Sequence, residues 1–320
     1  MDSESKTGRV VYMNGDFVPE EDAHFSIFDT AVATGEKVVE VTRTFCHKPF
    51  KLEDHVERLY EGLDALQINP GLTPDELIEI TQDAIRRNVS TQSEDVDWQI
   101  MHYISRGPAA HFEIIPEEDL QPTVLIHCIP LVNRLGKMAK KYSDGADLVV
   151  VEQRAIPQDI LRPQLKSNGR LDHVLGRLQA KLKCPGSTGV LLDKDGYLTE
   201  GTGTSLFLVK EEVIQTAPAV RVLTGITRKM IFDIAHTLRI PIEEADLTVS
   251  DAEHADEIFI TSTVICHLHA KSFDGKSIHD GGIGPITSRV RQAFIEEIGL
   301  DYVQQAMQYD QFLRENGSLR

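Results

Sequence analysis

The sequence predicts an α+β protein built from two domains. Its 320 residues are a length typical of about two domains. Segments with strand patterns and segments with helix patterns follow one another in mixed order, which favours two α+β layers over a doubly wound parallel sheet. Hydrophobic residues form 41% of the chain and charged residues 26%, enough for ordinary cores beneath a charged surface.

The first domain, expected over residues 1–130, is a small α/β unit that opens with a hairpin. Two short apolar runs flank Asn14-Gly15, and this dipeptide is typical of a two-residue hairpin turn. A helix is expected after Thr73-Pro74-Asp75-Glu76, because a threonine followed three residues later by a glutamate can cap a helix start from both sides. The further elements expected are a helix over about residues 52–66 and strands over residues 37–45, 98–104 and 123–130.

A linker is expected over residues 131–138, and the second domain, over residues 139–320, is richer in strands. Its first predicted helix is marked by apolar residues that recur at helical spacing, namely Leu171, Val174, Leu175, Leu178 and Leu182. A second helix is expected to begin near Thr227, and a final helix is expected to end near Ile298. Strands are expected over residues 146–151, 189–192, 197–198, 205–209 and 257–261.

The charge and the cysteines of the chain indicate which classes of partner and which cellular compartment to expect. The formal net charge is −17, whereas a nucleic-acid backbone and an anionic membrane both attract clustered Lys and Arg. The four cysteines lie far apart and form no CxxC pair, as is typical of reduced thiols in the cytosol. The start of the chain has no signal-peptide pattern, and no apolar run approaches the roughly 20 residues of a membrane helix. We therefore expect a cytoplasmic protein whose partners are small molecules.

Lys166, in the run Gln164-Leu165-Lys166-Ser167-Asn168-Gly169, is the candidate catalytic residue. It lies just before the helix expected near Arg170, where the positive end of the helix dipole disfavours an ammonium group. A lysine with a lowered pKa can form an imine with a carbonyl compound near neutral pH. Taken alone, however, a lysine beside a helix start is more often an exposed surface group.

Four further segments could bind a phosphorylated ring cofactor together with this lysine. Glu200 lies among small, flexible residues in Thr199-Glu200-Gly201-Thr202, where a carboxylate could keep a pyridine nitrogen protonated. Backbone N–H groups and hydroxyls that could bind a phosphate are offered by Gly225-Ile226-Thr227 before a helix and by Thr261-Ser262-Thr263 after a strand. Arg58 could pair with the same phosphate. Each segment alone also fits an ordinary turn, helix cap or surface salt bridge.

In this order and spacing, the segments resemble the class IV, fold-type IV aminotransferases. The resemblance rests on Lys166-Ser167, on the run from Leu191 through Asp195-Gly196 to Thr202, on Leu223 to Arg228, and on Ser262-Thr263. It covers nearly the whole chain, since Tyr12 to Gly15, Phe50 to Leu59 and Gly284 to Thr287 also fit. The family includes branched-chain aminotransferases, D-amino-acid aminotransferases, (R)-selective amine transaminases and aminodeoxychorismate lyase.

The resemblance implies the cofactor pyridoxal 5'-phosphate and a role for each matching residue. Lys166 would carry the internal aldimine and move the proton between the substrate α-carbon and the cofactor. Glu200 would face the pyridine nitrogen, and Leu223 would pack against the ring. The phosphate would be bound by Arg58, Ile226, Thr227, Ser262 and Thr263. The implied fold is a small N-terminal α/β domain with a larger C-terminal strand-rich pseudo-barrel domain and the cofactor between them, and the implied assembly is a homodimer.

The substrate side matches the family pattern less well. Val39 stands where members of the family usually have an aromatic residue that contacts the substrate. Arg106-Gly107 resembles the D-amino-acid branch without its second arginine, and His111 matches the carboxylate-binding histidine of that branch. Either Arg106 and His111 bind a substrate carboxylate or the pocket accepts a less acidic amine. The candidate substrate residues are therefore Val39, Arg106 and His111.

The predicted function is the transfer of an amino group from an amino acid or an (R)-type amine to a 2-oxo acid. Two alternatives stay open: a lyase of the aminodeoxychorismate type that uses the same cofactor, and a non-catalytic relative that only binds it. Cys266-His267-Leu268-His269 places two histidines on one face of a strand, but two ligands without a third make a weak metal site. No metal is expected.

Overall fold

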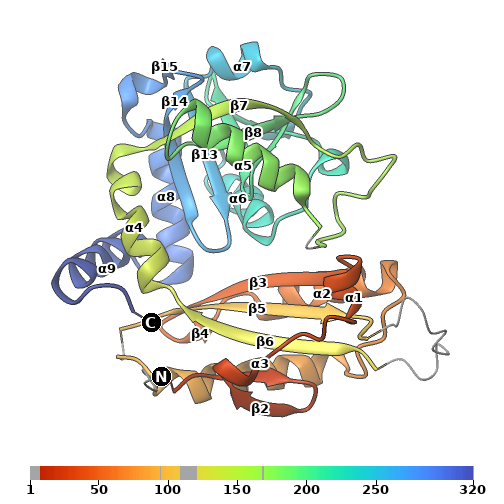
Figure 1. The fold of residues 1–320 in the computed structure, drawn as a ribbon. Coiled ribbons are helices and arrows are strands. Elements are labelled where there is room, and N and C mark those ends of the chain that lie inside the picture. Colours follow the sequence, from red (N-terminus) through yellow and green to blue (C-terminus); the bar gives the residue numbers. More distant parts are fainter. Residues whose placement is uncertain (1–7, 94, 109–120, 168, 320) are drawn as a thin grey trace. The chain divides into compact units, whose positions relative to one another are not determined.

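The computed structural model describes residues 8–93, 95–108, 121–167 and 169–319, and they fold into two compact units (Figure 1). The first unit comprises Met1–Asn133, Leu165–Gly169 and Gly317–Arg320, and the second comprises Arg134–Gln164 and Arg170–Asn316. The segment that contains Lys166 thus belongs to the N-terminal unit, although we expected it within the C-terminal domain. The physical reason is that this segment pairs with Val38 and Val39 of the N-terminal unit.

The first unit is built on a six-stranded sheet in the order β2-β1-β6-β5-β3-β4. The predicted helix at 52–66 and the three predicted strands are confirmed to within one residue at their ends. The strands are β1 (Val10–Met13), β2 (Asp16–Pro19), β3 (Lys37–Phe45), β4 (Lys48–Pro49), β5 (Trp98–Ser105) and β6 (Thr123–Pro130). The helices are α1 (Thr30–Ala33), α2 (Leu52–Ala65), α3 (Pro74–Val89) and a 3₁₀ turn at Glu20–Asp22.

Both local signals in this unit form as the sequence predicts. Asn14 and Gly15 adopt φ angles of 50° and 104°, and they connect β1 to β2 in a tight hairpin. Thr73 and Glu76 form a reciprocal capping box at the start of α3.

One face of the six-stranded sheet packs against α2 and α3 (Figure 1). Side chains alternate between the two faces of a strand. Val38 and its register partner Ile104 belong to the core under the helices. Val39 and its register partner Tyr103 therefore point to the opposite face.

The second unit contains a nine-stranded sheet in the order β12-β11-β10-β13-β14-β7-β8-β9, with β15 paired to β14. A bridge between Gly201 and Thr204 links the end of β9 to the start of β10, so the sheet curls back on itself as a strand-rich pseudo-barrel. Its strands are β7 (Ala146–Arg154), β8 (Thr188–Leu192), β9 (Leu198–Gly201), β10 (Ser205–Lys210), β11 (Val213–Thr216), β12 (Ile242–Glu244), β13 (Glu257–Ser262), β14 (Cys266–Phe273) and β15 (Lys276–Ser277).

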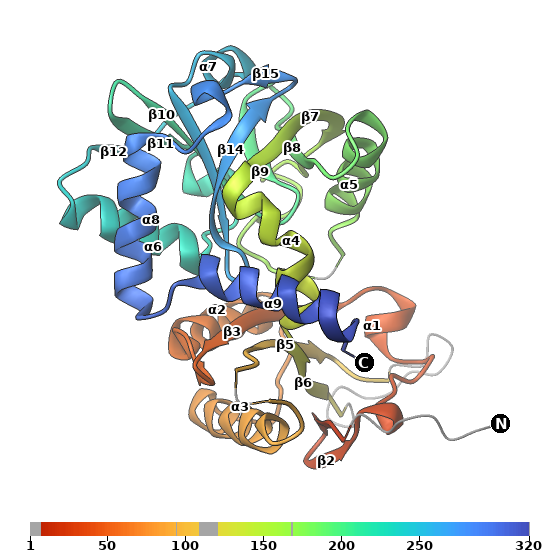
Figure 2. The ribbon, with the colours of Figure 1, turned by 90° about the vertical axis from the view of Figure 1, so that its left-hand side faces the viewer.

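Helices surround this sheet, and α6 and α8 pack against each other beside it (Figure 2). The helices of the second unit are α4 (Val132–Asp144), α5 (Leu171–Lys183), α6 (Ile226–Thr237), α7 (Val249–Glu253), α8 (Pro285–Ile298) and α9 (Tyr302–Asn316), with 3₁₀ turns at Ala219–Arg221 and His279–Gly281. The expected linker at 131–138 lies mostly within α4. Val132, Leu135 and Ala139 are buried there, and this apolar spacing favours a helix over an extended linker.

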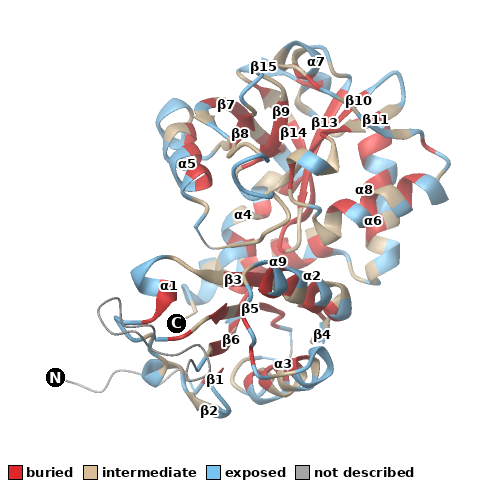
Figure 3. Ribbon diagram, turned by 90° about the vertical axis from the view of Figure 1, so that its right-hand side faces the viewer, coloured by how far each residue is buried: buried red, intermediate tan, exposed pale blue. Residues whose placement is uncertain are grey.

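Helix α5 forms where its apolar residues predict, but those residues do not face the core. Leu171 is 63% exposed and Leu182 is 86% exposed, whereas Asp172, His173, Gly176 and Ala180 are buried. Figure 3 shows both buried and exposed residues along α5. A Cβ atom at Gly176 would lie 2.9 Å from Thr202 Cγ2 and 3.1 Å from Leu191 Cδ2. The helix therefore approaches the sheet through its small residues, because a larger side chain there would not fit.

No helix among the described residues is long and apolar enough to cross a membrane.

Candidate active site

Lys166 lies at the edge of the sheet in the first unit, beside β3. The N–H of Val39 donates to the carbonyl oxygen of Lys166 at 2.9 Å, and Val38 forms an antiparallel bridge with Ser167. This register places Lys166 opposite Val39, and residues opposite each other across two strands point to the same face. The register therefore assigns Lys166, Val39 and Tyr103 to the face of the sheet opposite α2 and α3.

Glu40, the next residue on β3, is a buried carboxylate that binds Arg58. The guanidinium of Arg58 donates from Nε to Oε2 at 2.9 Å and from Nη2 to Oε1 at 2.7 Å, and Nδ1 of His55 lies 3.0 Å from Oε1. Burial alone would raise the pKa of Glu40, but Arg58, the His55 hydrogen bond and the charge of Lys166 hold that pKa far below its usual range. Glu40 is thus a permanent anion that fixes the plane of Arg58.

Arg106 has partners within the first unit that differ from the substrate carboxylate suggested by its sequence context. Its Nε and Nη2 donate to Oε1 of Glu36 at 2.9 and 2.7 Å. Its Nη1 and Nη2 also donate to the carbonyl oxygens of Gln67 and Leu66, at 3.0 and 2.6 Å. All three guanidinium nitrogens therefore bind Glu36 or the backbone at the end of α2.

Glu200 lies on β9 of the second unit, where it is 8% exposed. Its Oε1 lies 3.3 Å from Nε2 of His173 and 3.4 Å from Nη2 of Arg170. Arg170 occupies the N-cap position of α5, and His173 is buried in the first turn of that helix. The close approach of α5 through Gly176 brings both side chains to the carboxylate.

The start of α6 lies beside the end of β13 in the same unit. No side chain caps Gly225 at the N-cap position, and the first turn of the helix contains no acidic residue. Ser205 Oγ would lie 3.4 Å from a Cβ atom at Gly225, and Ser205 pairs with Thr261 in the register of β10 with β13. Backbone N–H groups at such a helix start lack partners within the helix and bind anions well.

Hydroxyl groups gather at the same end of this sheet. The Oγ1 atom of Thr261 is buried and has no hydrogen-bond partner among the described residues. Ser262 ends β13 and is half-buried, as is Thr263 after it. Leu223, half-buried in the loop before α6, accepts the N–H of Gly225 at 2.8 Å.

The predicted site residues thus form two groups, one in each unit. Lys166, Arg58, Val39 and Arg106 belong to the first unit. The second unit holds Glu200, Leu223, Ile226, Thr227, Ser262 and Thr263. His111 lies outside the described residues.

The HxH pair of β14 is buried in the core of the second unit. The ring of His267 packs against Phe259 with centroids 4.7 Å apart, and Nδ1 of His269 accepts from Nη2 of Arg291 at 2.9 Å. Across the described ranges, no group of three or more His, Cys, Asp or Glu residues could hold a metal ion.

Three residues of the site are not predicted by the sequence patterns. Glu40 and His55 orient Arg58, and His173 contacts Glu200. A usable signal existed for Glu40, since a charged residue inside an apolar strand is rarely buried without a partner. The sequence gives no such signal for His173. The apolar residues of α5 predict that their own side of the helix is buried, whereas the structure buries the side that carries His173.

Comparison with known proteins identifies the family of the chain. The class IV aminotransferase family matches residues 37–273. A Methanocaldococcus jannaschii protein, provisionally named a branched-chain-amino-acid aminotransferase, is 33% identical over 285 residues, which cover 89% of this chain and 94% of its own. The D-alanine aminotransferase of Listeria monocytogenes serotype 1/2a is 30% identical over 291 residues, covering 90% and 96%.

Solved structures show the same fold. The Escherichia coli branched-chain amino acid aminotransferase superposes with a TM-score of 0.80 at 29% identity, covering 90% of this chain and 94% of its own. A second branched-chain amino acid aminotransferase, solved with pyridoxamine 5'-phosphate, superposes with a TM-score of 0.82 at 26% identity, covering 95% and 97%. The chain belongs to the class IV aminotransferase family.

Proposed function

We propose that the chain binds pyridoxal 5'-phosphate through the residues that its family resemblance implies, and that Lys166 moves the proton of the substrate. The chain is a pyridoxal-phosphate-dependent aminotransferase, and its substrates are amino acids and 2-oxo acids. One observation in the second unit carries the residue assignment. Glu200 and Ser205 flank the turn closed between Gly201 and Thr204, and Ser205 lies beside the uncapped start of α6. The turn thus joins the strand of the buried carboxylate to the strand next to that helix start.

The chemistry of these groups fits the cofactor. The Glu200 carboxylate would suit a protonated pyridine nitrogen, and Leu223 would offer an apolar surface for the ring. The buried hydroxyl of Thr261, which has no hydrogen-bond partner among the described residues, supports a further polar group at this end of the sheet. We assign the phosphate to the N–H groups at the start of α6 and to Arg58, Ile226, Thr227, Ser262 and Thr263.

The protein residues then have separate tasks. When bound, pyridoxal 5'-phosphate withdraws electrons from the substrate carbon that bears the amino group and holds that group between the two half reactions. The Nζ atom of Lys166 would take the proton from that α-carbon and deliver it to the cofactor carbon, and the second half reaction would run this transfer in reverse. Glu200, which contacts His173 and Arg170, would be the carboxylate that faces the pyridine nitrogen.

On the substrate side, we propose that Val39 forms part of the pocket wall, since the register puts it on the face of Lys166. Arg106 would position this part of the pocket indirectly, because its nitrogens bind Glu36 and the backbone at the end of α2. His111 remains a proposed carboxylate ligand.

We further propose that the protein is a cytoplasmic homodimer. Helix α5 exposes five apolar side chains, and Ile27, Phe28 and Val32 in the first unit are 55% to 76% exposed. Apolar groups of this kind usually mark a protein interface, and we assign them to a second copy of the chain. The described cysteines are all free thiols, which suits a reducing compartment. Multi-angle light scattering should give twice the chain mass for the wild type and a smaller mass for Leu178→Asp; a wild-type monomer would contradict the homodimer.

Absorption spectroscopy tests the cofactor assignment. The purified protein should be yellow, and Lys166→Ala should lose the visible absorption of the lysine-linked cofactor. A colourless wild type that added pyridoxal 5'-phosphate does not restore would contradict the assignment. A panel of D-amino acids, branched L-amino acids and (R)-1-phenylethylamine, each with pyruvate or 2-oxoglutarate, then identifies the amino donor.

A further inference from the structure

Lys37 is a second lysine on the face of the sheet that carries Lys166. It opens β3 and pairs in register with Ser105, two positions before the pair of Val39 with Tyr103. Residues two apart on a strand point to the same side and are separated by roughly 7 Å. Because Lys166 lies opposite Val39, Lys37 is one such step along the strand from the catalytic lysine.

The surroundings of Lys37 are aromatic. Its Nζ lies 5.8 Å from the ring centroid of Phe25 and 5.9 Å from that of Tyr103. The neighbouring carboxylate of Glu36 binds Arg106, and no carboxylate of the described residues forms an ion pair with Lys37. A half-buried ammonium between two aromatic rings, without an acidic partner in the described part of the chain, is suited to bind an anion.

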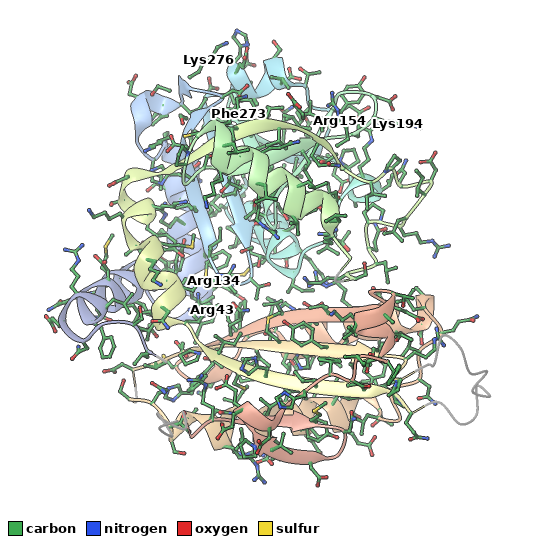
Figure 4. The ribbon with its side chains drawn as sticks, in the orientation of Figure 1. Arg43, Arg134, Arg154, Lys194, Phe273 and Lys276 are labelled. Carbon is green, nitrogen blue, oxygen red and sulfur yellow. The ribbon has the colours of Figure 1, made fainter. Side chains whose placement is uncertain are left out.

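Two other cations of the first unit are poorly placed for the same task. The nitrogens of Arg106 already bind Glu36 and two backbone carbonyls. Arg43 is six residues further along β3, roughly 20 Å from Lys37. Arg43, which is labelled in Figure 4, is fully buried. Its guanidinium carbon lies 4.2 Å from the ring centroid of Phe45. Lys37 is therefore the cation of this strand nearest to Lys166 along the shared face.

We propose that Lys37 determines substrate specificity by binding a carboxylate of the amino acid or the 2-oxo acid. This inference rests on the proposed role of Lys166, because it uses the face that the two lysines share. The carboxylate has two possible sources: the α-carboxylate, common to all amino acids, and the distal carboxylate of a dicarboxylic substrate. Either would exchange its water shell for a charge-assisted hydrogen bond to Nζ.

Steady-state kinetics of Lys37→Gln and Lys37→Arg test the proposal, with Lys48→Gln as a control. Lys48 is an exposed lysine of β4 in the same unit, so its variant has the same change of charge. Lys37→Gln should raise the KM for 2-oxoglutarate by about ten- to a hundredfold with a smaller change in kcat, the size expected for one hydrogen bond to a charged group. Lys37→Arg should recover most of this loss, and Lys48→Gln should match the wild type.

The choice of substrates separates the two sources. A KM increase for 2-oxoglutarate but not for pyruvate identifies the distal carboxylate, and an increase for both identifies the α-carboxylate. The KM for (R)-1-phenylethylamine, which has no carboxylate, should be unchanged. Unchanged KM values for both acids, or an equal increase for the amine, would overturn the proposal.

A binding measurement keeps this result separate from the cofactor assignment. Glutarate has two carboxylates and no reactive carbonyl, so calorimetry can measure its binding without turnover. Its affinity should fall in Lys37→Gln and recover in Lys37→Arg. The visible absorption of the bound cofactor should be the same in all these variants. A protein without that absorption refutes the role of Lys166, whereas a yellow Lys37→Gln enzyme with wild-type glutarate affinity refutes only the role of Lys37.

Discussion

Arg58 and Glu40 form a two-point ion pair inside the first unit, with Nε–Oε2 and Nη2–Oε1 distances of 2.9 and 2.7 Å. Their side chains are only 7% and 1% exposed. Two parallel hydrogen bonds fix both the position and the plane of a guanidinium. The orientation of the proposed phosphate ligand Arg58 is therefore set by a strand residue before any cofactor binds.

Breaking this pair should destabilise the first unit. Glu40→Gln is expected to lower the free energy of unfolding by about 3–5 kcal/mol, because it leaves a buried guanidinium without its counter-charge. Asp83→Asn, which removes exposed pairs with Arg86 and Arg87, should cost less than about 1 kcal/mol. Urea denaturation measures the free energy of unfolding of both variants. Equal decreases would show that the buried pair stabilises the protein no more than the exposed pairs do.

Removing the charge of Glu200 should affect turnover more than cofactor binding. Glu200→Gln is expected to lower kcat by about a hundredfold or more, a size typical of losing a preorganised electrostatic partner in an active site. His173→Asn should have a smaller effect, since Arg170 still contacts the carboxylate. Stopped-flow measurement of the first half reaction reports the difference. A Glu200→Gln enzyme with wild-type kcat would refute its place beside the pyridine nitrogen.

The hydroxyl of Thr227 should contribute to cofactor affinity. Thr227→Val is expected to weaken the binding of pyridoxal 5'-phosphate by about tenfold or more, because it removes one hydrogen bond to a charged group. Thr237→Val provides a matched control at the far end of α6, where the Thr237 hydroxyl bonds only to the carbonyl of Asp233 at 2.9 Å. Absorbance titration of the apoenzyme should separate the two. Equal affinities would place the phosphate elsewhere.

Stability should fall with acid because His102 is buried as a neutral ring. Burial is the main cause that lowers its pKa from 6.5 to about 4. Between these values the unfolded chain binds the proton and the folded chain does not, so stability is complete above pH 6.5 and falls as the pH decreases toward 4. At pH 5 the loss from this group is about 2 kcal/mol.

Urea denaturation at pH 7 and pH 5 tests this pH dependence. His102→Gln, which can retain a bond to Thr81, should lose less stability between the two pH values than the wild type. An unchanged difference would mean that other groups, such as His267 and His269, dominate. The pKa values of both are also lowered, chiefly by burial.

The close approach of α5 to its sheet should be intolerant of added volume. Gly176→Val is expected to lower the free energy of unfolding by about 1–3 kcal/mol, because its side chain would collide with Thr202 and Leu191. Lys181→Val introduces the same residue on the exposed side of α5 and should cost less. Because α5 carries His173, Gly176→Val should also lower kcat. A variant as stable and active as the wild type would contradict this packing.

Much of the fold could be predicted from local patterns. The strands β3 and β6 end at the expected residues, and the Asn14-Gly15 hairpin and the Thr73–Glu76 capping box form as predicted. These features depend on residues close in sequence, so their physics is contained in the sequence itself. The family motifs likewise identified the cofactor chemistry, because each spans a continuous run of residues.

The other features of the fold and the site depend on contacts between residues that are far apart in the sequence. No local pattern shows that residues 165–169 pair with β3, that Arg106 binds Glu36, or that α5 turns its leucines away from the sheet. Each outcome depends on which segments meet after folding, and on the volume and charge available there. By itself, the sequence determined the class of chemistry and named Lys166 and Glu200. Only the tertiary structure decided which partners hold them and brought Lys37 onto the face of Lys166, because register between distant strands sets which side chains share a surface.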